Sequence, residues 1–310
     1  MRQLIRSVQL SLLLTSLALF AFAPLTRLRA DTSNAGKNIW EGKSGGFIIR
    51  WSTSDIMAQS TSNLKKVVFS ARSLAQKDLD DVISKGRESY GERNPIVLYE
   101  RKFTVLSVAG SMISLKDHYF ASFKREAHPA GETRFATIDL AKEGEIGDKD
   151  VTDSLNTHLA GSGKVVKLTD FFSESDVLHA LLDDPLVRKA LQNSGDPTPP
   201  NTLAKLIAQF SSAPIVEGEC YSVSDDLLTR FAFHHIEKGK VAVRLGLSGA
   251  GPCREALTQL GILLPIPESL KGSLALAESR KEGFLMKTQE KIAPNQKTTL
   301  TFSASKDAGH

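Results

Sequence analysis

Cysteine is scarce in this chain, which has only Cys220 and Cys253 among its 310 residues. No CxxC pair is present, and no histidine lies at zinc-finger spacing from either cysteine. This argues against a metal site or a reactive dithiol built on these residues. In an oxidising compartment we expect them to form one structural disulfide, closing a loop of about 33 residues worth roughly a few kcal/mol.

A basic excess is also missing once the first 30 residues are set aside. The whole chain has 39 basic and 35 acidic residues. Residues 1–30 hold four of the arginines and no acidic residue, which leaves 35 basic residues against 35 acidic ones. A nucleic-acid-binding protein is expected to carry a basic excess on one face. The balance therefore argues against a nucleic-acid partner.

The first 30 residues have the pattern of a secretory signal peptide. Arg2 and Arg6 precede an apolar run over residues 10–25, and Ala30 provides a small residue before a cut. This arrangement is what export machinery and its peptidase recognise. We predict that residues 1–30 are removed and that the protein is exported, to the periplasm or the medium.

Two alternatives to this cut stay open. A cut after Ala23 fits the small residues there but places Pro24 directly after it. An uncleaved anchor would need ~20 apolar residues, which the run barely approaches. If the segment is cleaved, we expect no stable membrane span.

Strand patterns dominate the first part of the remaining chain. Strands are predicted at 46–52, 67–71, 96–123 and 134–140. Breaks at 108–111 and at Lys116-Asp117 are predicted to divide the stretch 96–123 into separate strands. Helical spacing covers 76–90, with Gly86 weakening its end.

A helical block and a second strand-rich region follow. Three helices are predicted, the first capped by Ser173, the second starting at Pro185 and the third ending at Phe210. A hairpin of 231–236 and 241–245 is predicted next, then a helix over 268–278. The predicted class is α+β, with antiparallel sheet segments and a helical block between two strand-rich regions. We expect a strand-rich part at 31–115, an α+β domain at 116–279 and a polar, flexible tail at 280–310.

The middle of the chain resembles a known family. The resemblance is carried by 119–123, Ala127-His128-Pro129, 137–140 and 163–172, and in outline by 231–270. These segments are similar to the RsiV-like domain family, found in the ectodomain of a lysozyme-sensing anti-sigma factor and in the non-catalytic part of a secreted peptidoglycan deacetylase. The resemblance implies an α+β envelope domain that binds peptidoglycan or a lysozyme-like wall enzyme. We expect no sigma-binding segment before the apolar run and no deacetylase domain. The resemblance therefore implies neither the complete anti-sigma role nor the deacetylase activity, and it assigns no catalytic residue to this chain.

Three catalytic or ligand-binding motifs are incomplete. Gly246-Leu247-Ser248-Gly249-Ala250, with a helix predicted at 254–260, resembles a nucleophile elbow, but the only later histidine is His310. Gly161 to Lys164 lacks the first glycine and the Ser or Thr of a phosphate loop. Asp148, Asp150 and Asp153 do not follow the calcium-loop pattern. We therefore predict no catalytic set, no metal site and no cofactor.

Histidines are the remaining candidates. His128, in the segment that best resembles the family, is predicted to contact a ligand together with Arg125 and Glu126. His118, His234 and His235 are also candidates, although alternation predicts that His234 and His235 point to opposite faces of a strand.

We favour an exported, non-enzymatic protein that binds peptidoglycan or a wall-active protein. The alternative is a cell-wall hydrolase or deacetylase, with a site built from His128, His234 or His235 and a carboxylate such as Asp117 or Asp139. A purely structural role is the third hypothesis.

Overall fold

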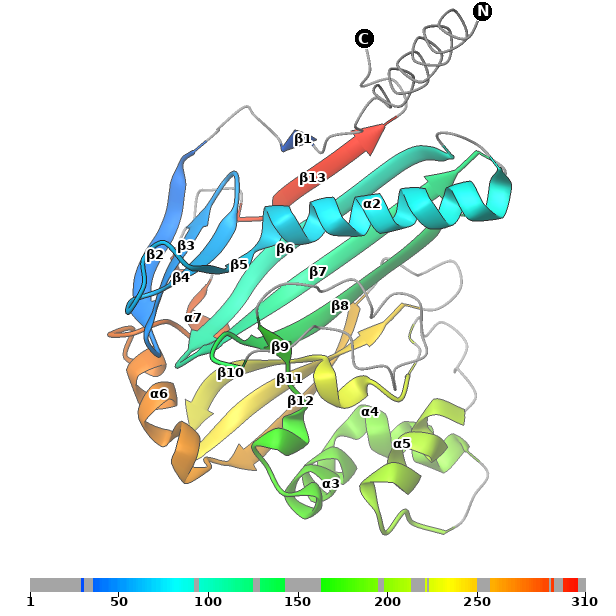
Figure 1. Cartoon of the computed structure of the whole chain (residues 1–310). Helices are drawn as coiled ribbons and strands as arrows, with labels where there is room; N and C mark the ends of the chain where they lie inside the picture. Colours follow the sequence, from blue (N-terminus) through cyan, green and yellow to red (C-terminus); the bar gives the residue numbers. More distant parts are fainter. Residues whose placement is uncertain are drawn as a thin grey trace, which may run out of the picture.

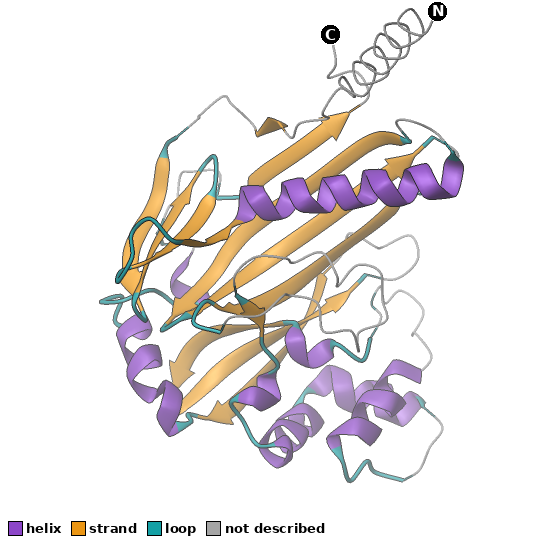
Figure 2. Ribbon diagram, viewed as in Figure 1, coloured by secondary structure: helices purple, strands orange, loops and turns teal. Residues whose placement is uncertain are grey.

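The computed structural model describes residues 29–30, 36–91, 95–124, 129–142, 163–194, 198–212, 221, 223–249, 257–289, 291–292 and 298–305. They form an α+β fold with three antiparallel sheets, which confirms the predicted class (Figures 1 and 2). The predicted helical block also lies between two strand-rich regions in the chain.

The largest sheet has six strands in the order β1-β13-β6-β7-β8-β9. Its strands are β1 (Arg29–Ala30), β6 (Ile96–Ala109), β7 (Met112–Phe123), β8 (Ala130–Asp139), β9 (Lys164–Val165) and β13 (Leu300–Ser305). The long hairpin of β6 and β7 forms its centre, and β13 comes back from the C-terminal end of the chain to pair with β6 (Figure 1).

Helix α2 (Ala71–Tyr90) lies across one face of this sheet (Figure 1). It begins five residues earlier than predicted because the Ser70 side chain caps it, accepting a hydrogen bond from the Ser73 amide. The helix continues through Gly86 to Tyr90. A Cβ at Gly86 would lie 2.6 Å from Cγ of Pro95, so this glycine allows the helix to pack closely against the start of β6.

A four-stranded sheet extends the core around α2. It contains β2 (Asn38–Ser44), β3 (Phe47–Ser52), β4 (Ile56–Ser60) and β5 (Val67–Ser70) in sequence order. Trp51 is fully buried in the core that this sheet shares with α2 and the six-stranded sheet. Trp40 contacts Phe284 edge to face, with ring centroids 5.0 Å apart.

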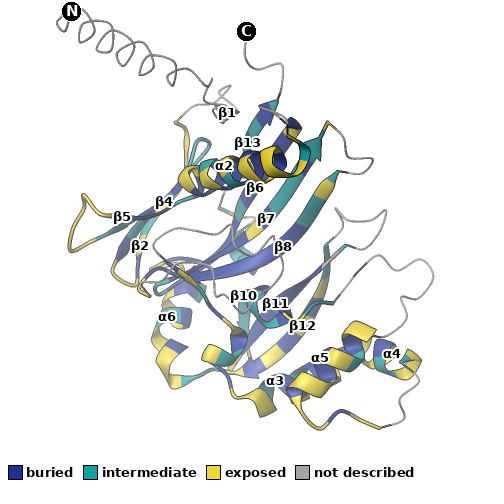
Figure 3. Ribbon diagram, turned by 45° about the vertical axis from the view of Figure 1, so that its right-hand side comes forward, coloured by how far each residue is buried: buried dark blue, intermediate teal, exposed yellow. Residues whose placement is uncertain are grey.

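The third sheet consists of β10 (Phe231–Glu237), β11 (Lys240–Ser248) and β12 (Leu257–Pro265). One of its faces forms a second core with α3 (Glu174–Asp183), α4 (Pro185–Asn193), α5 (Leu203–Ser212) and α6 (Glu268–Glu278). Asp184 connects the helices to the third sheet. One of its carboxylate oxygens caps α4, and the other accepts a hydrogen bond from the Gly261 amide of β12. Figure 3 shows the exposed residues of these helices on their outer sides.

The opposite face of the third sheet contacts the six-stranded sheet. Ala232 of β10 packs with Leu106 and Phe135, which lie on β6 and β8. The Thr137 hydroxyl donates a 2.5 Å hydrogen bond to the Phe231 carbonyl. Short segments complete the fold: η3 (Leu168–Asp170), η4 (Leu227–Thr229) and α7 (Met286–Gln289).

The predicted strand break at Lys116-Asp117 is wrong, because β7 runs straight through it. Asp117 is only 2% exposed, and an arginine supplies the charge that makes its burial tolerable. The domain boundary expected between residues 115 and 116 falls inside β7, so the parts on either side of it share one sheet.

The predicted helix at 254–260 is also wrong from residue 257 onward. Leu260, Ile262 and Leu264 alternate with exposed residues and form the buried side of β12. Ser248 ends β11, and the next described element is β12, so the described residues show no helix of the kind that follows a nucleophile elbow.

The predicted flexible tail at 280–310 is wrong for its described residues. Phe284 and Phe302 are fully buried, and Phe284 exchanges two backbone hydrogen bonds with Val108 of β6. Gly283 makes this approach possible, because a Cβ there would lie 2.1 Å from the Val108 carbonyl oxygen. The buried residues of β13 alternate with polar ones, so the sequence gives only a weak strand pattern there. The strand is recognised from its pairing with β6.

Within the described residues, no helix is both long enough and apolar enough to cross a membrane.

Replacing Phe302 by alanine should destabilise the protein by about 3–5 kcal/mol, the usual cost of removing a fully buried aromatic ring. Urea unfolding of the purified protein measures this loss. Ser303→Ala, on the other side of the same strand, is the matched control and should change stability by no more than ~0.5 kcal/mol. Equal effects of the two substitutions would contradict a core role for β13.

Candidate functional site

The residues predicted to bind a ligand lie outside the described part of the chain. Arg125, Glu126 and His128 fall between β7 and β8. Cys220 and Cys253, predicted to form a disulfide, also lie outside it, as do Asp148, Asp150 and Asp153. These predictions stay untested by the structure.

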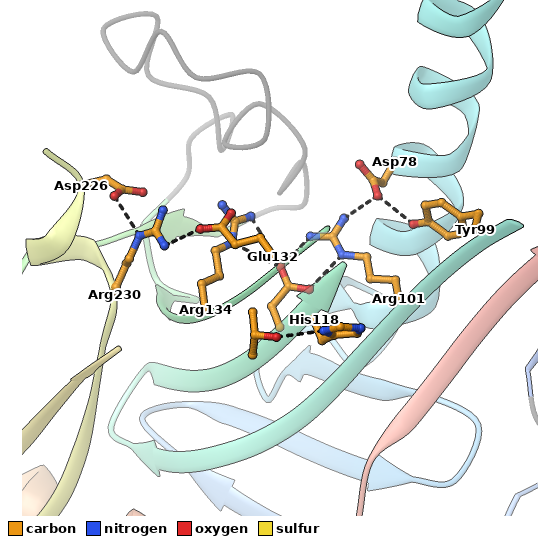
Figure 4. Close-up of polar contacts among 10 residues, drawn as sticks. Asp78, Tyr99, Arg101, His118, Glu132, Arg134, Asp226 and Arg230 are labelled. Carbon is orange, nitrogen blue, oxygen red and sulfur yellow. Dashed lines mark hydrogen bonds and ion pairs between the residues drawn. The ribbon is translucent and has the colours of Figure 1, made fainter. Parts of the chain in front are cut away.

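A buried ion-pair network crosses the six-stranded sheet beneath α2 (Figure 4). At its centre Arg101 of β6 binds Asp117 of β7 through two hydrogen bonds, of 3.0 Å from Nε and 2.8 Å from Nη2. Nη1 of Arg101 lies 3.0 Å from a carboxylate oxygen of Asp78 on α2. Arg134 of β8 approaches the Asp117 carboxylate at 3.5 Å.

The register of the strands explains why these charges meet. Asp117 lies opposite Phe103 on β6 and opposite Arg134 on β8, so that the Asp117 and Arg134 side chains share the face covered by α2. Arg101 is two residues from Phe103 and therefore projects from the same face. Tyr99 follows in the same row, and its hydroxyl donates a 2.7 Å hydrogen bond to Asp78.

The electrostatics of the network fix its charges. Burial would raise the pKa of Asp117, but the charges and hydrogen bonds of Arg101 and Arg134 together outweigh it and hold this pKa below the usual range. Burial would lower the pKa of Arg101, yet the charges of Asp117 and Asp78 keep it above the ordinary value. Burial, then the Asp78 charge, raises the pKa of Tyr99. Asp117 therefore remains an ionised, fully engaged carboxylate, unsuited to proton transfer.

A second cluster involves β8 of the same sheet. Arg230, which follows η4, donates a 2.8 Å hydrogen bond from Nε to Asp226 and forms an ion pair with Glu132 of β8 (Figure 4). Burial would lower the pKa of Arg230, but the carboxylates of Asp226 and Glu132 raise it. The cluster ties η4 to β8 and joins the third sheet to the first.

Two other candidates that the structure describes, Asp139 and His118, have local partners of their own. Asp139 accepts hydrogen bonds from the Ser111 hydroxyl at 2.6 Å and the Ala141 amide at 3.1 Å. Nδ1 of His118 lies 2.8 Å from the Thr133 hydroxyl, on the face of the sheet opposite Asp117. No three potential metal ligands gather among the residues that the structure describes.

His234 and His235 lie side by side, contrary to the prediction that they point to opposite faces. The register of β10 with β11 shifts between Phe233 and His235, so that one residue is inserted as a β-bulge. The two Nδ1 atoms are 2.7 Å apart, within hydrogen-bond distance. Nε2 of His235 lies 3.4 Å from the Glu237 carboxylate. Simple alternation missed this pair, because the sequence carries no clear signal of a bulge.

The environment of His234 disfavours its charged form. Partial burial, then the nearby charge of Arg244, lowers the pKa of His234 to about 4, and His235 and Lys287 add to this effect. A neutral imidazole therefore lies among two cationic side chains and a second imidazole.

The comparisons with known proteins add no functional assignment: no protein-family model matches this chain, and no curated protein or solved structure matches it.

Replacing Arg101 by methionine should lower the free energy of unfolding by at least about 3 kcal/mol, because two buried carboxylates would lose their main counter-charge. Chemical denaturation measures this change. The control is Arg50→Met, since Arg50 pairs with Glu41 at 3.1 Å on the surface, where an ion pair contributes only ~0–1 kcal/mol. A similar small loss for both variants would contradict the central role of Arg101.

His234 should titrate in the folded protein with a pKa of about 4, below the ordinary value of 6.5. Between these pH values the unfolded chain binds more protons than the folded one, so the free energy of unfolding decreases as the pH falls through this window. NMR of the imidazole ring gives the pKa directly, and denaturation at several pH values gives the stability.

Two variants test the cause. Arg244→Gln should raise the pKa of His234 by removing a neighbouring positive charge, and His234→Gln should reduce the loss of stability between pH 6.5 and about 4. An ordinary His234 pKa in the unmodified protein would contradict the surroundings described for this side chain.

Proposed function

We propose that this chain is an exported, non-enzymatic protein of the cell envelope that binds peptidoglycan or a wall-active protein such as lysozyme. Its N-terminal segment has the features of a signal peptide. Its middle region resembles the RsiV-like domain family, whose members act in the envelope.

The observation that carries the proposal is the sequence resemblance itself, and three of the segments responsible for it include residues of the neighbouring strands β7, β8 and β9. Residues 119–123 lie on β7 and residues 137–140 extend from the end of β8, which pairs with β7. Residues 163–172 include β9, which pairs with β8, and η3. Residues 137–140 and 163–172 thus meet at one end of β8, while residues 119–123 lie beside its other end.

Binding is favoured over catalysis because the carboxylates considered for chemistry have structural roles. Asp117 is buried between Arg101 and Arg134. Asp139 is held by Ser111 and by the backbone of Ala141. A general base must reach a proton on its substrate, and neither carboxylate is free to do so.

One observation favours the alternative, a cell-wall hydrolase or deacetylase. Glu237, His235 and His234 form a chain of polar contacts of 3.4 and 2.7 Å, and such a chain can orient an imidazole for proton transfer. It lacks an assigned nucleophile or metal among the described residues, so it stays the second candidate.

The test uses the exported, processed protein in sedimentation with purified peptidoglycan and in pull-down with lysozyme, while released product is monitored. Saturable binding without product is the expected result, and His128→Ala should weaken it. His179→Ala, on the solvent-exposed side of α3, is the matched control and should bind normally. Product release, or stoichiometric zinc whose removal abolishes it, would establish the hydrolase or deacetylase instead. Absence of binding to both would overturn the proposal.

A further inference from the structure

The four-stranded sheet has one buried face and one solvent-exposed face. The buried face packs on the core that the sheet shares with α2. The register of the strands places one residue from each strand side by side on the opposite face: Lys43 of β2, Ile48 of β3, Gln59 of β4 and Val67 of β5. Lys43 and Val67 are exposed, and the other two are partly exposed. We refer to this side of the sheet as the outer face.

The turn between β4 and β5 adds a second apolar side chain beside the outer face. Leu64 is 58% exposed, and Val67, which follows the turn, is 43% exposed. Two hydrogen bonds order the turn, each of 2.9 Å: the Gln59 side chain donates to the Leu64 carbonyl, and the Lys66 amide donates to the Asn63 carbonyl. Because Gln59 lies on the outer face, its hydrogen bond holds the Leu64 backbone beside that face.

Positive charge surrounds these two apolar residues. Lys65 and Lys66 lie between them in the sequence, and both lysines are exposed. Lys43 projects from the outer face in the same row as Val67. Residues 36–70, which include the whole sheet, contain five basic and two acidic residues, so their net charge is 5 − 2 = +3. The turn end of the outer face is therefore both cationic and apolar.

We propose that Leu64, Val67 and the neighbouring lysines dock this protein on the surface of a membrane that contains anionic lipids. Ammonium groups are attracted to anionic headgroups, and exposed apolar side chains enter the boundary between headgroups and acyl chains. A soluble polyanion would pair with the lysines but leave Leu64 and Val67 in water. A lipid surface matches both the charge and the apolar residues.

This docking is independent of the proposed wall binding. It uses a turn and one face of a sheet, whereas the wall proposal rests on the segments that resemble the RsiV-like family. Either proposal can fail while the other stands, because the two are measured with different ligands.

The experiment measures sedimentation of the exported, processed protein with vesicles of equal parts phosphatidylglycerol and phosphatidylcholine, and with vesicles of phosphatidylcholine alone. We expect saturable binding to the anionic vesicles only, and raising the salt concentration should weaken it because salt screens exposed charges. Leu64→Ser and Lys65→Gln should each lower the affinity about fivefold, the loss expected for one partly inserted apolar side chain or one cation near the surface.

Two matched controls separate this surface from general effects of charge and hydrophobicity. Lys205→Gln removes an exposed lysine on α5, and Leu263→Ser removes a 43% exposed leucine on β12. Both should bind as the unmodified protein does. The proposal is overturned if both kinds of vesicle bind equally, or if the Leu64 and Lys65 variants bind as well as their controls. Equally tight binding of soluble polyglutamate, unaffected by Leu64→Ser, would also overturn it and would assign the surface to an acidic polypeptide.

Discussion

The guanidinium of Arg101 is the contact on which the arrangement of α2 and the six-stranded sheet depends. It is fully buried and binds carboxylates from two other elements, Asp117 of β7 and Asp78 of α2. Burying such an ion costs several kcal/mol unless its partners are in place. A shifted helix would leave a buried charge unpaired, so this network disfavours other placements of α2.

This constraint decides where function can lie. The central charges of the sheet are committed to holding α2, β6, β7 and β8 together (Figure 4). On the third sheet, a β-bulge brings His234 and His235 into contact. Bulges commonly redirect side chains in this way near binding sites.

Sequence reasoning failed where long-range pairing overrides local pattern. Lys116-Asp117 reads as a polar break, yet β7 continues because Arg101, 16 residues away, neutralises Asp117. The polar stretch after residue 280 hides β13, which becomes a strand only through its pairing with β6. His234 and His235 meet because one inserted residue changes the strand register, which depends on both β10 and β11.

The sequence by itself determined the α+β class, the helical block capped at Ser173 and started at Pro185, the β10–β11 hairpin and the helix over 268–278. These features depend on periodicity, capping and turn residues, which are local properties of the chain. Only the tertiary structure decided which charges are buried, which histidines meet and where the C-terminal residues lie. Those outcomes depend on contacts between residues far apart in sequence. A buried charge is tolerated only when an opposite charge lies beside it in the folded protein, and local sequence does not show that partner.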